Sequence, residues 1–246
     1  MSDLIAIEAH LRRAPFLHAY ELGDLDPREA PHTTWYASDT VDAVALIYRG
    51  LATPTVLALA DGDLTPQRAL LARVVADLAP PFYAHLSPGL ETALPLARTL
   101  LAHSIKMALT HRVAAPAGDV HWLTAADTDE VLAFYAVAYP AGFFSPQDLT
   151  RGRFVAVRDA NGFAAIAGTH VYSPAMRVAA LGSIATRPDA RGRGHDGRAT
   201  AALCHRIQDE VSVIGLNVRA DNAAAIACYR GVGFEPRHVY DEWRID

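Results

Sequence analysis

Residues 181–207 read LGSIATRPDARGRGHDGRATAALCHRI and combine an apolar segment, a glycine-rich loop and an amphipathic segment. The apolar segment predicts a strand that ends before Pro188, and the amphipathic segment predicts a helix from about Gly194 to Val211. The residues around the loop include three glycines and four arginines: Gly192, Gly194, Gly197, Arg187, Arg191, Arg193 and Arg198. Glycines let backbone N–H groups converge, and the start of a helix attracts an anion. The loop therefore predicts a phosphate or pyrophosphate site, unless it is only a turn before an ordinary helix.

The same glycines spell Gly192-x-Gly194-x-x-Gly197, the fingerprint of dinucleotide-binding folds. In those folds a strand runs directly into the first glycine, and an acidic residue ends the next strand. Here residues 188–190 intervene, and the acids at a suitable distance fall on the predicted helix. A dinucleotide-dependent oxidoreductase therefore remains only a minor alternative.

Residues 216–234, LNVRADNAAAIACYRGVGF, form the end of a predicted strand and a second predicted helix. Asp221 is expected to cap this helix, which would run from Asn222 to about Arg230 and be ended by Gly231 and Gly233. Asn222 and Tyr229 are seven residues apart, so their side chains share one face of the helix. An amide and a phenol are therefore available on one side of it.

Together the two segments resemble the GNAT acetyltransferase superfamily. The first resembles the acyl-CoA motif of that family, a strand followed by an R-x-x-G-x-G/A loop. The second resembles its next motif, N-x-x-A-x-x-x-Y followed by G-F, and the resemblance covers about residues 119–246. It implies an α/β (α+β) fold, a mixed and mostly antiparallel twisted sheet flanked by helices. It also implies transfer of an acetyl group from acetyl-CoA (coenzyme A) to a primary amine of a small-molecule or amino-acid-like acceptor, by direct attack in a ternary complex.

The resemblance also implies which residues hold the cofactor. The strand before the loop would part from its neighbour and leave backbone groups free for pantetheine, and the loop N–H groups would hold the pyrophosphate. The expected cofactor-binding residues are Ile184, Ala185, Thr186, Arg191, Gly192, Arg193, Gly194, His195, Asp196, Gly197, Asn217, Asn222 and Tyr229.

The catalytic groups follow from the same resemblance. Tyr229 would protonate the leaving thiolate, because a phenol and a thiol have similar pKa values; the alternative is a core tyrosine beside Phe234. A strand N–H group, such as that of Ile184, would stabilise the oxyanion. The sequence does not name the general base. Ser183 could order a water molecule and His170 could accept the proton, but His170 is otherwise an ordinary half-exposed sheet residue.

Asp196 departs from the family pattern, which usually has glycine or alanine there. A carboxylate about 6 Å from a phosphate charge costs on the order of 3 kcal/mol at a dielectric constant of 20. Binding would survive if Asp196 pointed to solvent or if Arg193 or Arg198 paired with it. The alternative is a non-catalytic acyl-CoA-binding sensor or pseudoenzyme.

The predicted acceptor site is aromatic. Tyr139, Phe143 and Phe144 follow the helix expected over residues 127–138 and would line an apolar acceptor pocket. Packing of the same side chains into the core is an equally good interpretation.

Residues 1–113 repeat the order of strands and helices at an offset of about 130 residues, which predicts a degenerate GNAT-like copy and hence a tandem pair. The turn-rich segment 114–119 would link this copy to the catalytic domain at 119–246. The loop at 60–66 has no arginine–glycine signature and carries two acids, so it should not bind pyrophosphate. The last predicted elements of the copy are a helix at Glu91–His103 and a strand at Ile105–Arg112.

The composition limits the remaining function classes. The chain has 246 residues, 51% of them hydrophobic and 20% charged, which excludes an intrinsically disordered protein. The net charge of −5 argues against binding to nucleic acid. Cys204 and Cys228 are expected to be buried and are too few for a disulfide framework. The 11 histidines lack the HxH and HExxH spacings, so no metal site is expected.

The segment MSDLIAIEAHLRR at the N-terminus lacks the basic start and apolar core of a signal peptide. No apolar run approaches the roughly 18 residues of a membrane span. These features predict a cytoplasmic protein that does not bind a membrane, acting as a monomer or homodimer. Lys106 is the one lysine, and this bias toward arginine indicates a GC-rich bacterial genome.

Overall fold

The structure, a computed structural model, describes residues 3–95, 97–140, 142 and 144–246. The chain divides into two compact units. The first unit comprises Met1–Lys106, Val218–Asp221 and Pro236–Asp246, and the second comprises Met107–Asn217 and Asn222–Glu235. Both units draw on residues from either side of the segment 114–119, and domains at 1–113 and 119–246 remain a prediction.

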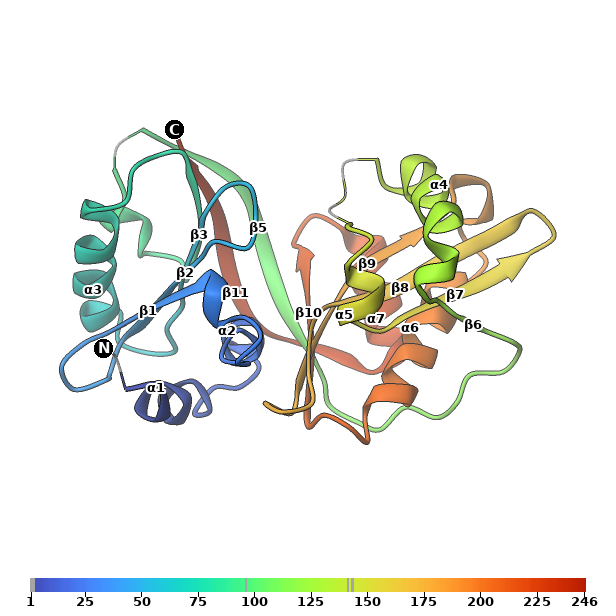
Figure 1. Cartoon of the computed structure of the whole chain (residues 1–246), viewed down its shortest axis with the longest axis horizontal. Coiled ribbons are helices and arrows are strands. Elements are labelled where there is room, and N and C mark those ends of the chain that lie inside the picture. The colour runs from blue at the N-terminus through green and yellow to red at the C-terminus, as the bar shows by residue number, and fades with distance from the viewer. Residues whose placement is uncertain (1–2, 96, 141, 143) are drawn as a thin grey trace. The chain divides into compact units, whose positions relative to one another are not determined.

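The second unit is a sheet with helices on both faces (Figure 1). Its elements are β6 (His121–Trp122), α4 (Thr128–Ala138), α5 (Asp148–Arg151), β7 (Phe154–Asp159), β8 (Gly162–Ser173), β9 (Val178–Thr186), α6 (His195–Ile207), β10 (Val213–Arg219) and α7 (Ala223–Val232). The strand order is β10-β9-β8-β7-β6. β9 and β10 are parallel, whereas the other neighbouring strands are antiparallel.

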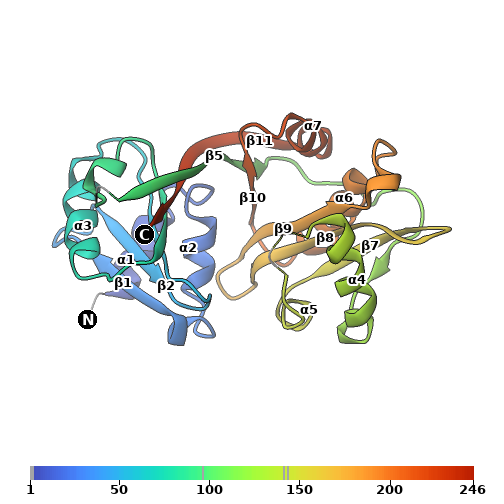
Figure 2. The ribbon, with the colours of Figure 1, turned by 90° about the horizontal axis from the view of Figure 1, so that it is seen from above.

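Helices α4 and α6 lie on opposite sides of this sheet (Figure 2). On α4, Val131 and Phe134 are buried at helical spacing and belong to one core cluster with Phe154 of β7. On α6, Leu203 and Ile207 are fully buried and one turn apart. Each helix therefore contributes one apolar face to the core, as its sequence period predicts.

The first unit has the same kind of framework. Its elements are α1 (Leu4–Leu11), α2 (Ala19–Asp24), β1 (Thr33–Ala37), β2 (Val44–Tyr48), β3 (Thr55–Ala58), α3 (Thr65–Ala76), β4 (Phe82–Leu86), β5 (Arg98–Leu109) and β11 (Phe234–Ile245). β3 and β4 are parallel, and α3 connects them. Leu71 and Val74 of α3 share a core cluster with Phe82 of β4. Each unit thus contains a parallel strand pair joined by a helix, β3-α3-β4 in the first and β9-α6-β10 in the second.

The helix predicted at Glu91–His103 is wrong. A short 3-10 helix covers Glu91–Ala93, and β5 already begins at Arg98. Pro95 explains the break, because proline removes a hydrogen bond from a helix interior and clashes with the preceding turn. Along β5 the buried residues alternate from Ala102 through Ser104 to Lys106, which is the period of a strand.

Smaller differences concern where elements end. α6 ends at Ile207 rather than near Val211. Asn222, not Asp221, caps α7: its Oδ1 accepts a hydrogen bond from the Ala225 N–H at 3.2 Å. Asp221 instead pairs with Arg219, whose Nη2 lies 2.7 Å from its carboxylate.

The helices are short. α6 has 13 residues and α3 has 12. Among the residues that the structure describes, no helix combines the length and the apolar character needed to cross a membrane.

Candidate active site

The strands β9 and β10 part beside the glycine-rich loop. Their register runs from Val178 opposite Val213 to Leu181 opposite Leu216. Beyond this point β9 continues to Thr186. The predicted cofactor residues Ile184, Ala185 and Thr186 all belong to this continuation, and Asn217 follows the last paired residue of β10. Thr186 Oγ1 is buried without a hydrogen-bond partner among the described residues.

The glycine-rich loop has an open backbone. Gly192 and Gly194 have φ values of 73° and 72°, a region that favours glycine. A Cβ atom at either position would meet no described atom within 4 Å. Gly194 is the N-cap residue of α6 and provides no side-chain cap, so the first N–H groups of α6 are available to another acceptor. The backbone of 192–197 therefore suits an anion.

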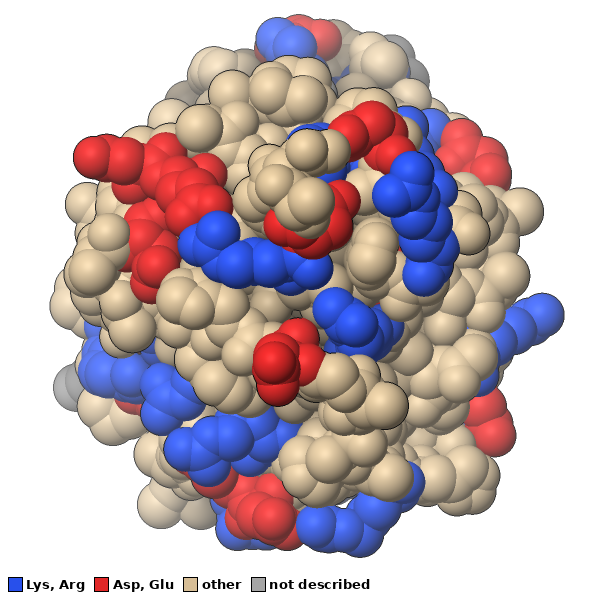
Figure 3. Space-filling model, turned by 90° about the vertical axis from the view of Figure 1, so that its right-hand side faces the viewer, with Lys and Arg blue, Asp and Glu red and all other residues tan. Residues whose placement is uncertain are grey.

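The arginines around the loop have different partners. Arg187 forms two ion pairs within the protein: its Nη2 lies 2.8 Å from the Asp159 carboxylate, and its Nε lies 2.5 Å from the Asp189 carboxylate. Arg191 and Arg193 are exposed, and Arg191 Nε donates weakly to the Thr186 carbonyl at 3.4 Å. On the face of the second unit in Figure 3, basic and acidic side chains are interspersed. Arg191 and Arg193 are thus exposed and could pair with a phosphate, and Arg198 Nε is buried without a hydrogen-bond partner among the described residues.

Asp196 contacts a residue that the sequence analysis did not associate with it. It lies in the first turn of α6, half-buried, and makes a side-chain hydrogen bond with Cys228 of α7. Among the described residues no ion pair joins it to Arg193 or Arg198. Burial, together with the Asp196 carboxylate, raises the pKa of Cys228 to about 12. Cys204 is fully buried as predicted, whereas Cys228 is only half-buried.

Tyr229 lies on α7 next to this pair. Its ring meets Phe234 edge-on, with 6.3 Å between ring centroids, and the residue is 9% exposed. Burial raises the pKa of the Tyr229 hydroxyl, and the neighbouring Cys228 and Asp196 raise it further. The hydroxyl therefore holds its proton at neutral pH. The ring packs in the core, and the hydroxyl is protonated, as a general acid must be.

Ser183 and His170, both predicted as catalytic candidates, are in contact. His170 Nε2 lies 3.2 Å from Ser183 Oγ. The contact needs Gly182, because a Cβ atom there would lie 2.3 Å from atoms of the His170 ring. Although His170 is exposed on the sheet, protein packed around its ring desolvates it and lowers its pKa, and Asp148 of α5 opposes this shift. His170 is therefore mostly neutral at pH 7, as a proton acceptor must be.

Two residues near this contact were not predicted to have a role there. The Tyr135 hydroxyl donates a hydrogen bond to the Ser183 carbonyl oxygen at 2.5 Å. The charge of the Asp148 carboxylate acts to raise the pKa values of both Tyr135 and His170. The sequence places Tyr135 on the apolar face of a helix and in the aromatic region considered for the acceptor pocket. Asp148 lies in a turn-rich segment without a recognisable motif.

The predicted acceptor residues differ in their exposure to solvent. Tyr139 is 47% exposed at the end of α4. Phe144 stacks on Tyr135 with 4.8 Å between centroids and meets Phe154 edge-on, so it packs into the core. Phe143 lies outside the described residues.

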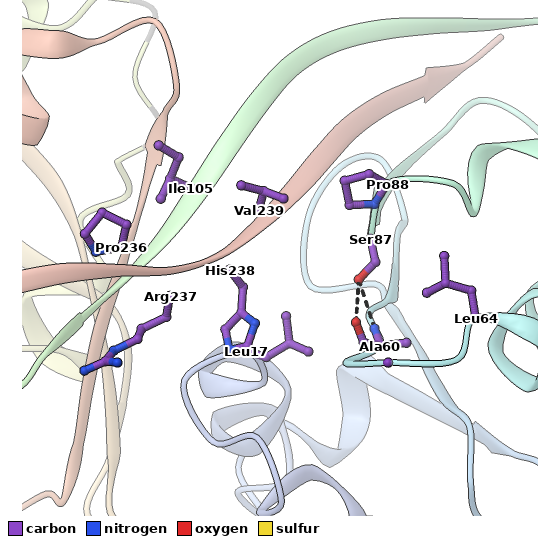
Figure 4. Close-up of a pocket in the computed structure, with 11 residues that line it drawn as sticks. Leu17, Ala60, Leu64, Ser87, Pro88, Ile105, Pro236, Arg237, His238 and Val239 are labelled. Atoms are coloured by element: carbon purple, nitrogen blue, oxygen red, sulfur yellow. Dashed lines mark hydrogen bonds between the residues drawn. The ribbon is translucent and has the colours of Figure 1, made fainter.

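A separate hollow of about 500 Å³ belongs to the first unit (Figure 4). It is lined by Leu17, Ala60, Gly62, Leu64, Ser87, Pro88, Ile105, Pro236, Arg237, His238 and Val239. The Ser87 hydroxyl accepts from the Ala60 N–H at 3.0 Å and donates to the Ala60 carbonyl at 3.1 Å. This serine ties the loop after β3 to the end of β4. All the predicted site residues belong to the second unit, so this hollow is not the predicted site.

Comparisons with known proteins bear on the family and the fold. The family model "Acetyltransferase (GNAT) family" matches residues 121–234. No curated protein sequence matches the chain significantly. Among solved structures, a GNAT-family protein from Novosphingobium aromaticivorans is 19% identical, with a TM-score of 0.67 over 91% of this chain and 95% of the other. A GCN5-related N-acetyltransferase from Kribbella flavida is 17% identical, with a TM-score of 0.66 over 93% and 95%.

A third solved structure is a tandem GNAT protein from the clavulanic acid biosynthesis pathway. It is 18% identical and has a TM-score of 0.54 over 92% of this chain and 86% of the other. At these identities the structures show the fold alone. The predicted fold class, a mixed and mostly antiparallel twisted sheet flanked by helices, is confirmed. Residues 121–234 therefore form a domain that matches the GNAT acetyltransferase family, whose members transfer acyl groups from acyl-CoA, and the fold agrees with that match.

Proposed function

We propose that the chain is an acetyl-CoA-dependent N-acetyltransferase that acetylates a primary amine of a small-molecule or amino-acid-like acceptor. The observation that carries the proposal is the parting of β9 and β10 next to an open glycine loop and an uncapped helix. A long thiol arm with a pyrophosphate fits both features, because a free strand edge and free N–H groups offer what its amides and phosphates bind. We assign the pyrophosphate to the N–H groups of 192–197 and the arm to 184–186, with Asn217 and Asn222 beside it.

Acetyl-CoA supplies an acetyl thioester, which an amine attacks at its carbonyl carbon. In our assignment, the Ile184 N–H donates to the oxygen of that carbonyl as negative charge develops. His170, held by Ser183, takes a proton from the acceptor ammonium so that the amine becomes nucleophilic. Tyr229 gives its proton to the departing thiolate. Tyr139 is the exposed aromatic residue that we assign to the acceptor.

We also propose that 119–246 is the catalytic domain and that 1–113 is a degenerate copy without a cofactor site. The loop after β3 supports this division, because it carries Asp61 and Asp63 and lacks arginine. Two neighbouring acids repel a pyrophosphate. The cytoplasmic location and the monomeric or dimeric state remain predictions from the sequence.

A second candidate function is a non-catalytic acyl-CoA sensor. The observation that favours it is Asp196, whose carboxylate lies in the first turn of α6 where a phosphate would bind. Such a protein would bind acetyl-CoA without transferring its acetyl group.

The first test is calorimetric titration with acetyl-CoA, with NAD as the control ligand. We expect micromolar binding of acetyl-CoA and none of NAD; no binding of acetyl-CoA would contradict both candidate functions. A screen of primary amines then identifies an acceptor by release of free thiol. Tyr229→Phe should slow this turnover at least 10-fold, since general acid–base catalysis typically contributes about 100-fold or more. Binding without turnover of any amine would favour the sensor.

A further inference from the structure

The Tyr135 hydroxyl is rigidly held at the centre of the second unit. The residue is 6% exposed, and its ring stacks on Phe144 and meets Phe134 edge-on at 5.3 Å. Burial raises the pKa of this hydroxyl far above its ordinary value, so it remains a hydrogen-bond donor at any working pH. Its acceptor is the Ser183 carbonyl oxygen, at 2.5 Å.

The acceptor residue has an unusual backbone. Ser183 has a φ of 50°, which costs energy for a residue with a side chain. The register between β8 and β9 steps from Gly168 opposite Gly182 to Ile166 opposite Ala185. Ser183 and Ile184 together therefore face one residue, Ala167, in a β-bulge. A bulge leaves a peptide group outside the regular ladder, and a buried carbonyl there needs another partner. Tyr135 provides it.

The Ser183 carbonyl and the Ile184 N–H belong to one peptide group. This group is planar and trans, so its C=O and N–H bonds point in opposite directions. When Tyr135 holds the carbonyl on the α4 side of the sheet, the Ile184 N–H points away from α4. The same backbone carries the Ser183 hydroxyl, which lies 3.2 Å from His170 Nε2. One hydrogen bond therefore sets the direction of two groups that the proposed function uses.

We propose that Tyr135 is a positioning residue, which holds the strained peptide between Ser183 and Ile184 so that the Ile184 N–H and the Ser183 hydroxyl point to the reacting groups. The inference rests on the proposed function for the roles of the Ile184 N–H and the Ser183 hydroxyl. That Tyr135 fixes the direction of these groups does not depend on the proposed function. Tyr135 does not touch a reacting atom.

The kinetic test uses Tyr135→Phe, which removes the hydroxyl and keeps the ring. Loss or misdirection of one oxyanion donor lowers kcat by about 100-fold or more, and we expect an effect of that order. The dissociation constant of acetyl-CoA, measured by calorimetry, should stay unchanged, because the loop at 192–197 is intact. Tyr172→Phe is the matched control: it removes a hydroxyl that donates to Glu210 in the same unit. An unchanged kcat, or an equal loss of affinity for acetyl-CoA, would overturn the inference.

The conformational test needs no turnover. In the NMR spectrum of the wild-type protein, the Tyr135 hydroxyl proton should exchange slowly and show a nuclear Overhauser effect to Ser183. In Tyr135→Phe the Ile184 amide signal and the Ser183 coupling constant that reports φ should shift, and in Tyr172→Phe they should not. A fast-exchanging hydroxyl in the wild type, or unchanged Ser183 and Ile184 signals in the variant, would overturn the inference even if the variant proved unstable. A wild-type protein that acetylates no amine would refute the proposed function. The NMR test would still decide whether Tyr135 holds the Ser183–Ile184 peptide group.

Discussion

Removing the charge of Asp196 should tighten the binding of acetyl-CoA. The carboxylate belongs to the first turn of α6, next to the N–H groups that we assign to the pyrophosphate. At about 6 Å and an effective dielectric constant of 20, repulsion between the two charges is about 2.8 kcal/mol. Screening over a Debye length of about 8 Å at 0.15 M salt reduces this to roughly 1.3 kcal/mol. The dissociation constant should therefore fall about 10-fold in Asp196→Asn at physiological salt, and up to about 100-fold at low salt.

The assay is calorimetric titration of wild type and variant with acetyl-CoA at two ionic strengths. Asp209→Asn is the control, because Asp209 lies beyond the other end of α6, exposed and paired with Arg112 at 2.6 Å. It changes the net charge equally and should alter the affinity less than 2-fold. A large loss of affinity in Asp196→Asn would refute the reasoning and mean that the bond to Cys228 holds the site together. An affinity that is equal at both salt concentrations would refute the electrostatic assignment.

The same variant has a readout that needs no ligand. The Asp196 charge and hydrogen bond contribute to raising the pKa of Cys228 to about 12. In Asp196→Asn this pKa should fall, while burial, the largest cause, keeps it above the ordinary value near 8.5. The rate of alkylation by iodoacetamide should rise at a lower pH than in wild type. Cys204 is fully buried and should contribute little to this rate.

Three other perturbations test the site and the framework. Gly182→Ala should lower kcat at least 10-fold with little change in the dissociation constant of acetyl-CoA, because its Cβ atom displaces the His170 ring; steady-state kinetics and calorimetry check this, and an unchanged kcat would count against His170 as the base. Because desolvation lowers the pKa of His170, kcat should rise with pH along a limb centred below about 6.5 and then level off; a limb centred above pH 7 would contradict that assignment. Lys106 is 4% exposed, with Tyr20 and Tyr240 rings 5.2 and 5.0 Å away. Lys106→Met should lower the free energy of unfolding, measured in urea, by about 3 kcal/mol, since the carboxylates around it lose their counter-charge; an unchanged midpoint would contradict this.

The glycine-rich loop at 192–197 is a feature that could be predicted from local sequence. The spacing of Gly192 and Gly194 before an amphipathic segment encodes two left-handed residues and a helix start, and the structure has both. Glycine tolerates positive φ without a steric cost, so the sequence shows where the backbone can adopt it. The strands at Phe82–Leu86 and Val213–Arg219 also match their predictions residue for residue, because short apolar runs bounded by turn residues have few alternatives.

The segment that forms β5 could not be predicted from its local sequence. Its leucines and alanines suit a helix by intrinsic preference, yet β5 extends from Arg98 to Leu109. Pairing with neighbouring strands outweighs that preference, which is a weak energy per residue. Lys106 is buried there among groups from α2 and β11, which its own neighbours in sequence do not reveal.

The sequence by itself indicated the family and the glycine-rich loop before α6, and it named Tyr229, Ser183 and His170 as candidates. Only the tertiary structure decided that Ser183 meets His170, that Asp196 faces Cys228, and that Tyr135 holds the bulge from 48 residues away. Glycine-rich turns and helix starts depend on neighbours within a few residues, so the sequence indicates them closely, although it placed the cap of α7 one residue too early. Contacts between side chains on different elements depend on how a sheet registers and where a helix packs, and those are settled only when the whole core forms.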